Sequence, residues 1–169
     1  MTAFFREKAS VKSCLLIGID SAVVSTVRYL KFDNAYIPSH IDISSTNDYQ
    51  FTLSHAANAS FLLTGSTSIR EAGSIAESIF QWYDETNSQY IGFKGALYSS
   101  PLGVSEYRRK NPYYRPAATA LIRSADFGGA DITVSLRVVS DSGSPDYAFG
   151  ASGFEAWSGY PCLQVFQSK

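Results

Sequence analysis

The chain has 169 residues, enough for one domain with a substantial core and few for two. An apolar fraction of 45% excludes a disordered chain, and a net charge of -1 excludes a broad basic surface for nucleic acid. No apolar run approaches the roughly 20 residues of a membrane-spanning helix, so we expect no membrane partner either.

Aromatic residues make up 14% of the chain, which favours strands and an interaction surface. Residues 1–12 lack the order of charge, apolar core and cleavage site that marks a signal peptide, so we expect synthesis in the cytoplasm. Cys14 and Cys162 lie near opposite ends of the chain. Terminal strands are often neighbours, so the two thiols either form a disulfide or, as we favour, stay free and buried.

Short strand-like runs separated by turn residues follow one another along the chain. The clearest alternation runs from Ile132 to Val138, and Phe80 and Trp82 share one face of another run. A weak helical pattern over Ser68–Phe80 contains Gly73 and several serines, so we expect a loop there. In chain order, the predicted strands cover residues 10–19, 23–32, 41–44, 49–53, 60–64, 79–84, 90–98, 117–123, 132–138 and 162–166.

About eight to ten short strands with intervening turns predict an all-β sandwich or barrel. We expect residues 1–22 to form an N-terminal arm or edge strand, and residues 23–169 to form the domain. Residues 99–116 contain three prolines and are expected to form a long loop outside any central strand.

Two segments carry a resemblance to a known group of proteins. Phe-Leu-Leu-Thr-Gly at residues 61–65 precedes Ile-Phe-Gln-Trp-Tyr-Asp-Glu-Thr-Asn-Ser-Gln-Tyr-Ile-Gly at residues 79–92. This combination resembles phage structural proteins that form trimeric jelly rolls with the topology of tumour necrosis factor and the complement globular head. The resemblance extends over roughly residues 23–166, most of the chain, and the arm before residue 23 and the loop at 99–116 depart from it.

The resemblance implies an antiparallel jelly-roll sandwich that assembles as a homotrimer. In such trimers aromatic and aliphatic residues line the three-fold axis. The residues expected at the trimer interface are therefore Phe80, Trp82, Tyr160 and Phe166.

No catalytic set is recognisable, so we do not expect an enzyme. The two histidines, His40 and His55, have no serine in a Gly-x-Ser-x-Gly elbow to act with, and residues 18–21 lack the second glycine. Asp84 and Glu85 are adjacent in a predicted turn, which is a simpler account of them than paired catalytic carboxylates.

Metal ligands are sparse as well. His40, Asp42 and His55 form at most a loose group, and Asp141 and Asp146 lack the dense alternation of oxygen ligands found in calcium loops. We expect no metal and no cofactor.

The loop at residues 107–116 packs four cations and three tyrosines into ten positions. Arg and Tyr are enriched where protein partners dock, so we interpret the loop as a contact surface. Phe4 and Phe5 suggest that the arm tucks against a neighbour. The expected partner-binding residues are Tyr107, Arg108, Arg109, Lys110, Tyr113, Tyr114, Arg115, Phe4 and Phe5.

Together these observations predict a virion structural protein, a trimeric cement protein that decorates the outer capsid surface and bridges capsomers. Its expected partners are copies of itself and the major capsid protein or another virion protein. The alternative is a receptor-binding knob or tail-fibre component that recognises a glycan or protein on a host cell.

Overall fold

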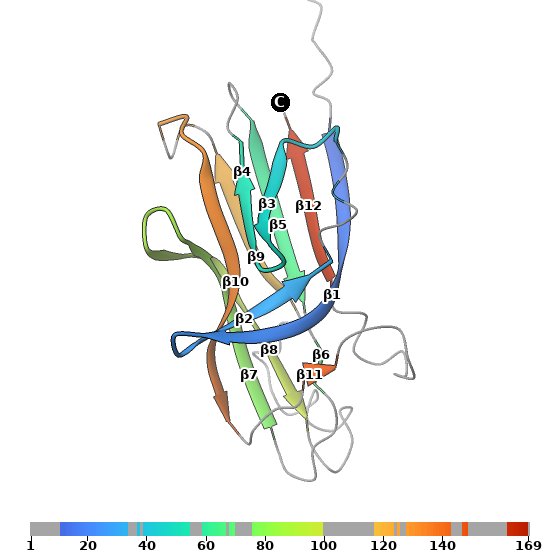
Figure 1. The fold of residues 1–169 in the computed structure, drawn as a ribbon, viewed down its shortest axis with the longest axis vertical. Coiled ribbons are helices and arrows are strands. Elements are labelled where there is room, and N and C mark those ends of the chain that lie inside the picture. Colours follow the sequence, from blue (N-terminus) through green and yellow to red (C-terminus); the bar gives the residue numbers. More distant parts are fainter. Residues whose placement is uncertain are drawn as a thin grey trace, which may run out of the picture.

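A computed structural model describes residues 11–33, 37, 39–54, 59–66, 68–69, 76–99, 117–123, 125, 128–142, 147–148 and 162–168. Within this part the regular elements are all strands, with no α-helix and so no helix that could cross a membrane (Figure 1). The strands are β1 (Val11–Val24), β2 (Val27–Phe32), β3 (Ile43–Asn47), β4 (Gln50–Leu53), β5 (Ser60–Ser66), β6 (Ser68–Ile69), β7 (Ala76–Asp84), β8 (Gln89–Ser99), β9 (Ala117–Arg123), β10 (Ile132–Ser142), β11 (Tyr147–Ala148) and β12 (Cys162–Ser168).

Ten of these strands form one antiparallel sheet in the order β2-β1-β12-β5-β9-β8-β7-β10-β4-β3, and β6 pairs with β11 separately. The sheet curls on itself, and a further pairing joins β2 to β10. Four of its pairs are nested in the sequence: β1 with β12, β4 with β10, β5 with β9, and β7 with β8. The predicted all-β class is confirmed, and the curled sheet is consistent with a β-sandwich.

β1 runs across the predicted boundary at residue 22 between the arm or edge strand and the domain. It is 14 residues long, pairs with β12 along its first part and bends to pair with β2 along its second (Figure 1). Cys14 and Leu16 point into the core. Residues 11–22 therefore belong to the sheet, because their long-range pairing with the last strand makes them part of it. Residues 1–10, including Phe4 and Phe5, lie outside the described residues.

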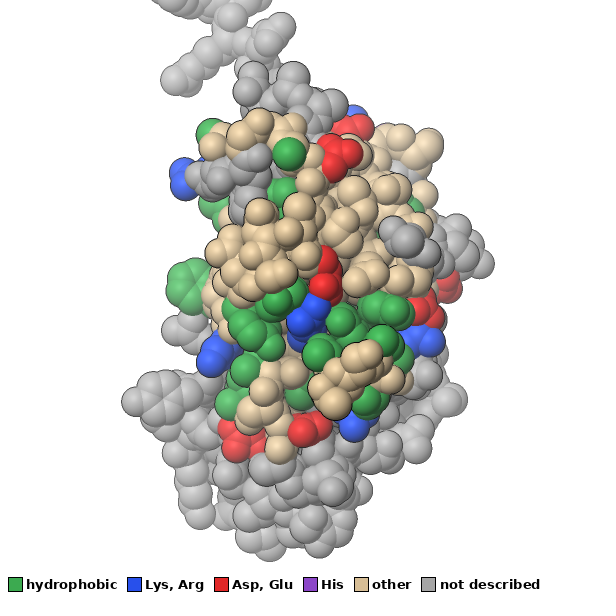
Figure 2. Space-filling model, turned by 60° about the vertical axis from the view of Figure 1, so that its left-hand side comes forward, with side chains coloured by type: hydrophobic (Ala, Val, Ile, Leu, Met, Phe, Trp, Pro, Cys, Tyr) green, Lys and Arg blue, Asp and Glu red, His purple; other side chains and the backbone are tan. Residues whose placement is uncertain are grey.

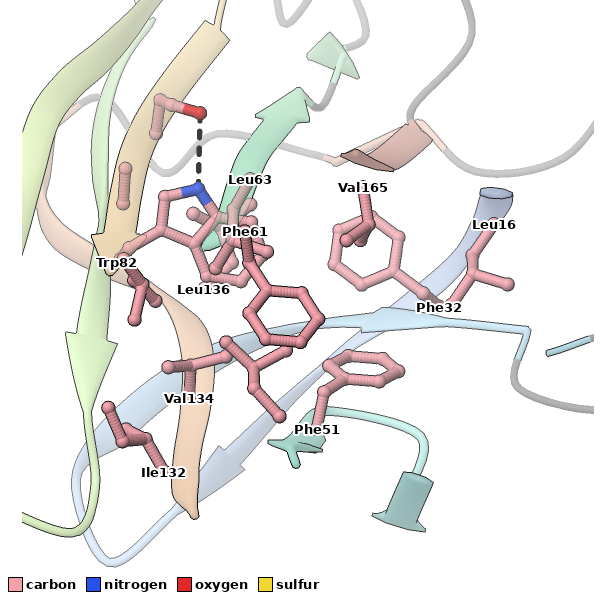
Figure 3. Packing of buried hydrophobic residues seen from close by; sticks show 14 of the residues in the cluster. Leu16, Phe32, Phe51, Phe61, Leu63, Trp82, Ile132, Val134, Leu136 and Val165 are labelled. Carbon is pink, nitrogen blue, oxygen red and sulfur yellow. Dashed lines mark hydrogen bonds between the residues drawn. The ribbon is translucent and has the colours of Figure 1, made fainter. Parts of the chain in front are cut away.

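The core lies between the two halves of the curled sheet, where inward side chains of both interdigitate (Figure 3). Trp82 is fully buried, and its indole Nε1 donates a hydrogen bond of 3.1 Å to the carbonyl oxygen of Ala118 on β9. Phe80 is fully buried as well. The expectation that Phe80 and Trp82 line a trimer interface is therefore wrong, because neither has any surface left to offer a second chain.

The β7–β8 hairpin forms as its sequence predicts. The Asp84 carboxylate is buried and accepts hydrogen bonds from the backbone N of Asn87 at 3.0 Å and from its side-chain Nδ2 at 2.7 Å. Thr86 Oγ1 accepts the backbone N–H of Thr133 at 2.9 Å, which ties the turn to β10. These bonds replace ladder pairing within the turn and fix the position of Glu85 beside β10.

Glu85 forms an ion pair with Arg137 of β10. Its carboxylate accepts hydrogen bonds from Arg137 Nε at 3.2 Å, from Arg137 Nη2, and from Ser135 Oγ at 2.5 Å. The carboxylate is 16% exposed. Its burial alone would raise its pKa, but the hydrogen bonds from Arg137 and Ser135 and the charge of Arg137 outweigh this and lower the pKa of Glu85.

A bulge in β8 depends on one glycine. Trp82 pairs with Ile91 and Phe80 with Gly95, so residues 92–94 are accommodated opposite Gln81. Gln81 Nε2 donates to the Gly92 carbonyl at 2.9 Å. Gly92 has a φ of 68°, which favours glycine.

We expect Gly92→Ala to destabilise the protein far more than Gly128→Ala. Both glycines have a positive φ, so each substitution costs about 1–2 kcal/mol of backbone strain. A Cβ at Gly92 would also overlap the Thr119 carbonyl oxygen and approach the Ala120 Cα to 2.7 Å, whereas a Cβ at Gly128 meets nothing within 4 Å. Urea unfolding should show an additional loss of about 2 kcal/mol or more for Gly92→Ala. Equal losses would mean that β8 does not approach β9 this closely.

The Glu85–Arg137 pair should give a defined pH dependence. Because the folded pKa of Glu85 is below its ordinary value of 4.5, the pair stabilises the fold above that pH and is lost as the pH falls through the folded pKa. Glu85→Gln should lower the free energy of unfolding by about 1–3 kcal/mol at pH 7. The wild type and the variant should converge in acid, where Glu85 is uncharged.

The control for this experiment is Asp141→Asn. Asp141 pairs with Arg28 at 3.5 Å, and the two side chains are 36% and 37% exposed. Because exposed pairs contribute little, this variant should lose at most about 1 kcal/mol at pH 7. A Glu85→Gln deficit that persists unchanged at pH 2.5 would contradict the assignment of the stabilisation to the ionised pair.

Candidate functional site

A row of apolar side chains crosses the outer surface of one half of the sheet. Leu121 of β9 pairs with Leu62 of β5, which pairs with Phe166 of β12. Leu121 is 62% exposed and Leu62 is 40% exposed, while Phe166 is partly buried. Cross-strand partners share one face of a sheet, so these three side chains lie side by side on the outside.

Two further apolar side chains extend this surface. Phe93 of β8 is 67% exposed and pairs with Thr119, which lies two residues from Leu121 on β9. Leu15 of β1 is 59% exposed and lies at the other end, two residues from Ser13, the partner of Phe166. We call the surface formed by Leu15, Leu62, Phe93, Leu121 and Phe166 the outer apolar face.

The strand period explains why these residues are not needed by the core. On β5, Phe61 and Leu63 point inward and are buried, so Leu62 between them points outward. On β9, Ala120 and Ile122 are buried in the same way on either side of Leu121. A strand that is apolar on both faces is typical of a sheet covered on both sides. The part of the chain that the structure describes packs against the inner side of these strands and leaves Leu62 and Leu121 exposed on the outer side.

The outer apolar face has no charge at its centre. Between the apolar side chains its strands carry the uncharged residues Thr64 and Thr119, both partly buried. Arg123, which is exposed, lies at the end of β9. Depletion of charge at the centre with polar residues at the rim is the composition of protein–protein interfaces. The arrangement can bury apolar surface against another chain, and it offers no nucleophile or acid–base pair.

The structure places the predicted contact residues in three different ways. Phe166 lies on the outer apolar face, whereas Phe80 and Trp82 lie in the core. The third group lies outside the described residues: Tyr107, Arg108, Arg109, Lys110, Tyr113, Tyr114, Arg115, Phe4, Phe5 and Tyr160.

Leu62 and Leu121 were missed as surface residues. The predicted strand at residues 60–64 contains the run Phe61-Leu62-Leu63, and these three successive apolar residues are the available signal. Side chains alternate between the two faces of a strand, so the middle residue of such a run lies on the opposite face from the other two. If two of the three enter the core, the third predicts an apolar contact on the other face of the sheet.

Cys14 has a free, buried thiol, which confirms the favoured expectation for this residue. In the ladder Cys14 pairs with Val165, whereas Cys162 pairs with Ile17, three residues further along β1. Three residues along a strand span roughly 10 Å. A disulfide joins Cα atoms about 4.4–6.8 Å apart, so the alternative of a Cys14–Cys162 bridge is wrong. Burial raises the pKa of the Cys14 thiol, which keeps it protonated and unreactive.

Among the described residues no three His, Cys, Asp or Glu side chains lie together as metal ligands. His40 is exposed, and Asp42 instead accepts a hydrogen bond of 2.5 Å from Nε2 of the buried Gln167. A void of about 10 Å³ between the sheet halves is lined by apolar side chains such as Leu63 and Trp82, and has no room for a ligand.

The chain matches no protein-family model and no curated protein sequence.

Proposed function

We propose that this chain is a virion structural protein: a homotrimeric jelly roll of the tumour necrosis factor type that decorates the outer capsid surface and bridges capsomers. The observation that carries the proposal is the outer apolar face, a surface without charge at its centre that the described residues leave exposed. Large contiguous apolar patches are rare on monomeric proteins and mark association sites.

The strand pairing supports the jelly-roll assignment. A jelly roll is a long two-stranded hairpin wrapped into a sandwich, so its strands pair from the outermost in sequence to the innermost. The nested pairs β1–β12, β4–β10, β5–β9 and β7–β8 follow this rule. The resemblance of residues 61–65 and 79–92 to phage trimers supports the same assignment independently of the pairing.

Self-association explains why the outer apolar face has its composition. A neutral, apolar surface has no charge pattern that selects an oppositely charged partner, and a neighbouring copy of the chain in a three-fold ring can cover it with a different part of its surface. Burying such surface contributes roughly 25 cal/mol per Å². Three copies arranged around an axis would each cover the face of a neighbour. A trimer also presents three attachment surfaces to the capsid at once, so weak individual contacts act together.

Replacing Leu62 and Leu121 by Glu should dissociate the trimer. Each substitution places a charge on the outer apolar face without touching the core, because both side chains point outward. Sedimentation equilibrium should give three times the chain mass of 18.5 kDa for the wild type and a single chain mass for the double variant. Circular dichroism should be unchanged, which separates dissociation from unfolding.

The matched control is Val23→Glu, which alters an aliphatic residue that is 58% exposed in the β1–β2 hairpin, away from this face. It should leave the trimer intact. A wild-type chain that sediments as a monomer, or a Leu62→Glu/Leu121→Glu variant that remains trimeric, would refute the proposed interface.

The capsid role is tested on purified virus particles. A cement protein should be present in hundreds of copies per particle, whereas a fibre or tail component should be present in a handful. Replacing Arg108 and Arg109 by Ala should reduce occupancy on capsids without lowering the melting temperature, because these residues lie in the predicted contact loop. The control Arg123→Ala alters an exposed cation at the end of β9 and should preserve occupancy. Low copy number would favour the receptor-binding alternative.

A further inference from the structure

The opposite half of the sheet carries a row of aromatic rings on its outer side. Tyr49 and Tyr29 have ring centroids 4.7 Å apart, and the guanidinium of Arg137 lies 5.0 Å from the Tyr29 centroid. The same guanidinium lies 3.5 Å from the centroid of Tyr83, whose ring is 5.0 Å from that of Tyr90. We call these five residues the tyrosine row.

The row follows from the register of four neighbouring strands. Tyr29 of β2 pairs with Arg137 of β10, and Tyr83 of β7 pairs with Tyr90 of β8. Strands lie about 4.8 Å apart, so the row extends over roughly 15 Å. Its members are exposed to different degrees: Tyr90 is 47% exposed, Tyr49 and Tyr83 are partly exposed, and Tyr29 is 7% exposed. The row thus has its most exposed ring at Tyr90 and its most buried ring at Tyr29.

Hydrogen bonds and ring contacts fix the guanidinium of Arg137 at the centre of the tyrosine row. Glu85 accepts hydrogen bonds from Nε and Nη2, and Nε also donates to Ser135 Oγ at 3.3 Å. Among the described residues these are the hydrogen bonds of the guanidinium, whose side chain is 11% exposed, so Nη1 is left as the fixed donor of this group. Tyr83 and Tyr29 pack against the guanidinium, which prevents it from turning.

The charges on this side are balanced within the chain. Arg137 pairs with Glu85, Lys31 pairs with Asp48 at 2.7 Å, and Arg28 pairs with Asp141. Figure 2 shows a basic and an acidic group beside one another within a band of hydrophobic side chains on this side of the molecule. A surface with its charges paired in this way has no net field to attract an anionic or a cationic ligand.

Uncharged polar groups border the rings. Gln50 lies close enough to Glu85 to contribute to the lowering of its pKa, and the hydroxyls of Thr52 and Thr133 are 3.0 Å apart on β4 and β10. Binding sites for small ligands combine aromatic surface with a few fixed polar groups that set orientation. A neutral sugar has both kinds of partner surface, since its ring faces expose C–H groups and its edge carries hydroxyls.

We infer that the tyrosine row binds a neutral oligosaccharide, with sugar rings packed on Tyr83 and Tyr90 and hydroxyls bonded to Arg137 Nη1 and the bordering polar groups. The inference goes beyond the proposed structural role and does not depend on trimer formation. It assigns ligand binding to the outer side of the β2-β10-β7-β8 half, which borders the outer apolar face along β8, where Tyr90 and Phe93 lie three residues apart.

The test probes the full-length protein against an immobilised panel of neutral oligosaccharides and of matched sialylated and sulfated ones. The strongest neutral binder is then titrated in solution by calorimetry, where avidity does not contribute. We expect binding to neutral members of the panel and a loss of about tenfold in affinity for Tyr90→Ala, because one stacked ring is removed. Tyr83→Phe should retain binding, since the ring is preserved.

The matched control is Phe93→Ala, which removes an aromatic ring that is 67% exposed on the outer apolar face and should leave affinity unchanged. Melting temperatures establish that each variant is folded. The inference is overturned if no member of the panel binds, if only acidic members bind, if Tyr90→Ala binds as well as the wild type, or if Phe93→Ala loses as much affinity as Tyr90→Ala. Capture of a protein in place of any sugar would likewise overturn it.

Discussion

The structure depends on one constraint: the first and last long strands must pair before the curled sheet can close. β1 pairs with β12 over seven consecutive positions, from Val11 with Ser168 to Ile17 with Cys162. The pairs β4–β10, β5–β9 and β7–β8 lie within the stretch of sequence that the β1–β12 pair encloses. Because β1 then bends to reach β2, and β2 meets β10, the same strand joins the two halves of the sheet. Strands as far apart in sequence as β1 and β12 pair slowly, because the chain between them loses conformational entropy before the contacts between the strands form.

Closure gives every strand an inner and an outer side, and the two outer sides differ in chemistry. The inner sides form one core around Trp82 and its neighbours. On the β1-β12-β5-β9 half the outer side is apolar and uncharged at Leu62 and Leu121. On the β2-β10-β7-β8 half it is aromatic, with charges paired as in Arg137 and Glu85. The first composition is suited to burial against another protein chain, and the second to a ligand that is partly polar and partly flat.

Local patterns predicted most of the fold because period-two alternation is a property of single strands. β9 was predicted with its observed bounds, and β10 was recognised from Ile132 onward. The same alternation could not distinguish whether Phe80 and Trp82 face the core of the chain or a trimer interface. It identifies the apolar side of a strand, but not what packs against that side. Local sequence patterns could not predict the tyrosine row either. Tyr29, Tyr83 and Arg137 are far apart in sequence and meet only through strand register.

The position of the two surfaces has a consequence for the proposed assembly. If the outer apolar face is buried around a three-fold axis, Tyr29, Tyr83 and Arg137 lie on the other half of the sheet, while Tyr90 lies three residues from Phe93 on β8, at the border between the two surfaces. The side chains of Glu85 and Arg137 are only 16% and 11% exposed, and their pairing matters because an unpaired charge beside the aromatic rings would favour charged ligands. Assembly and recognition would thus use the outer sides of the two halves of one sheet, with Trp82 and the shared core between them. Substitutions on either outer side can therefore be interpreted separately, since residues that share no partners have nearly additive effects.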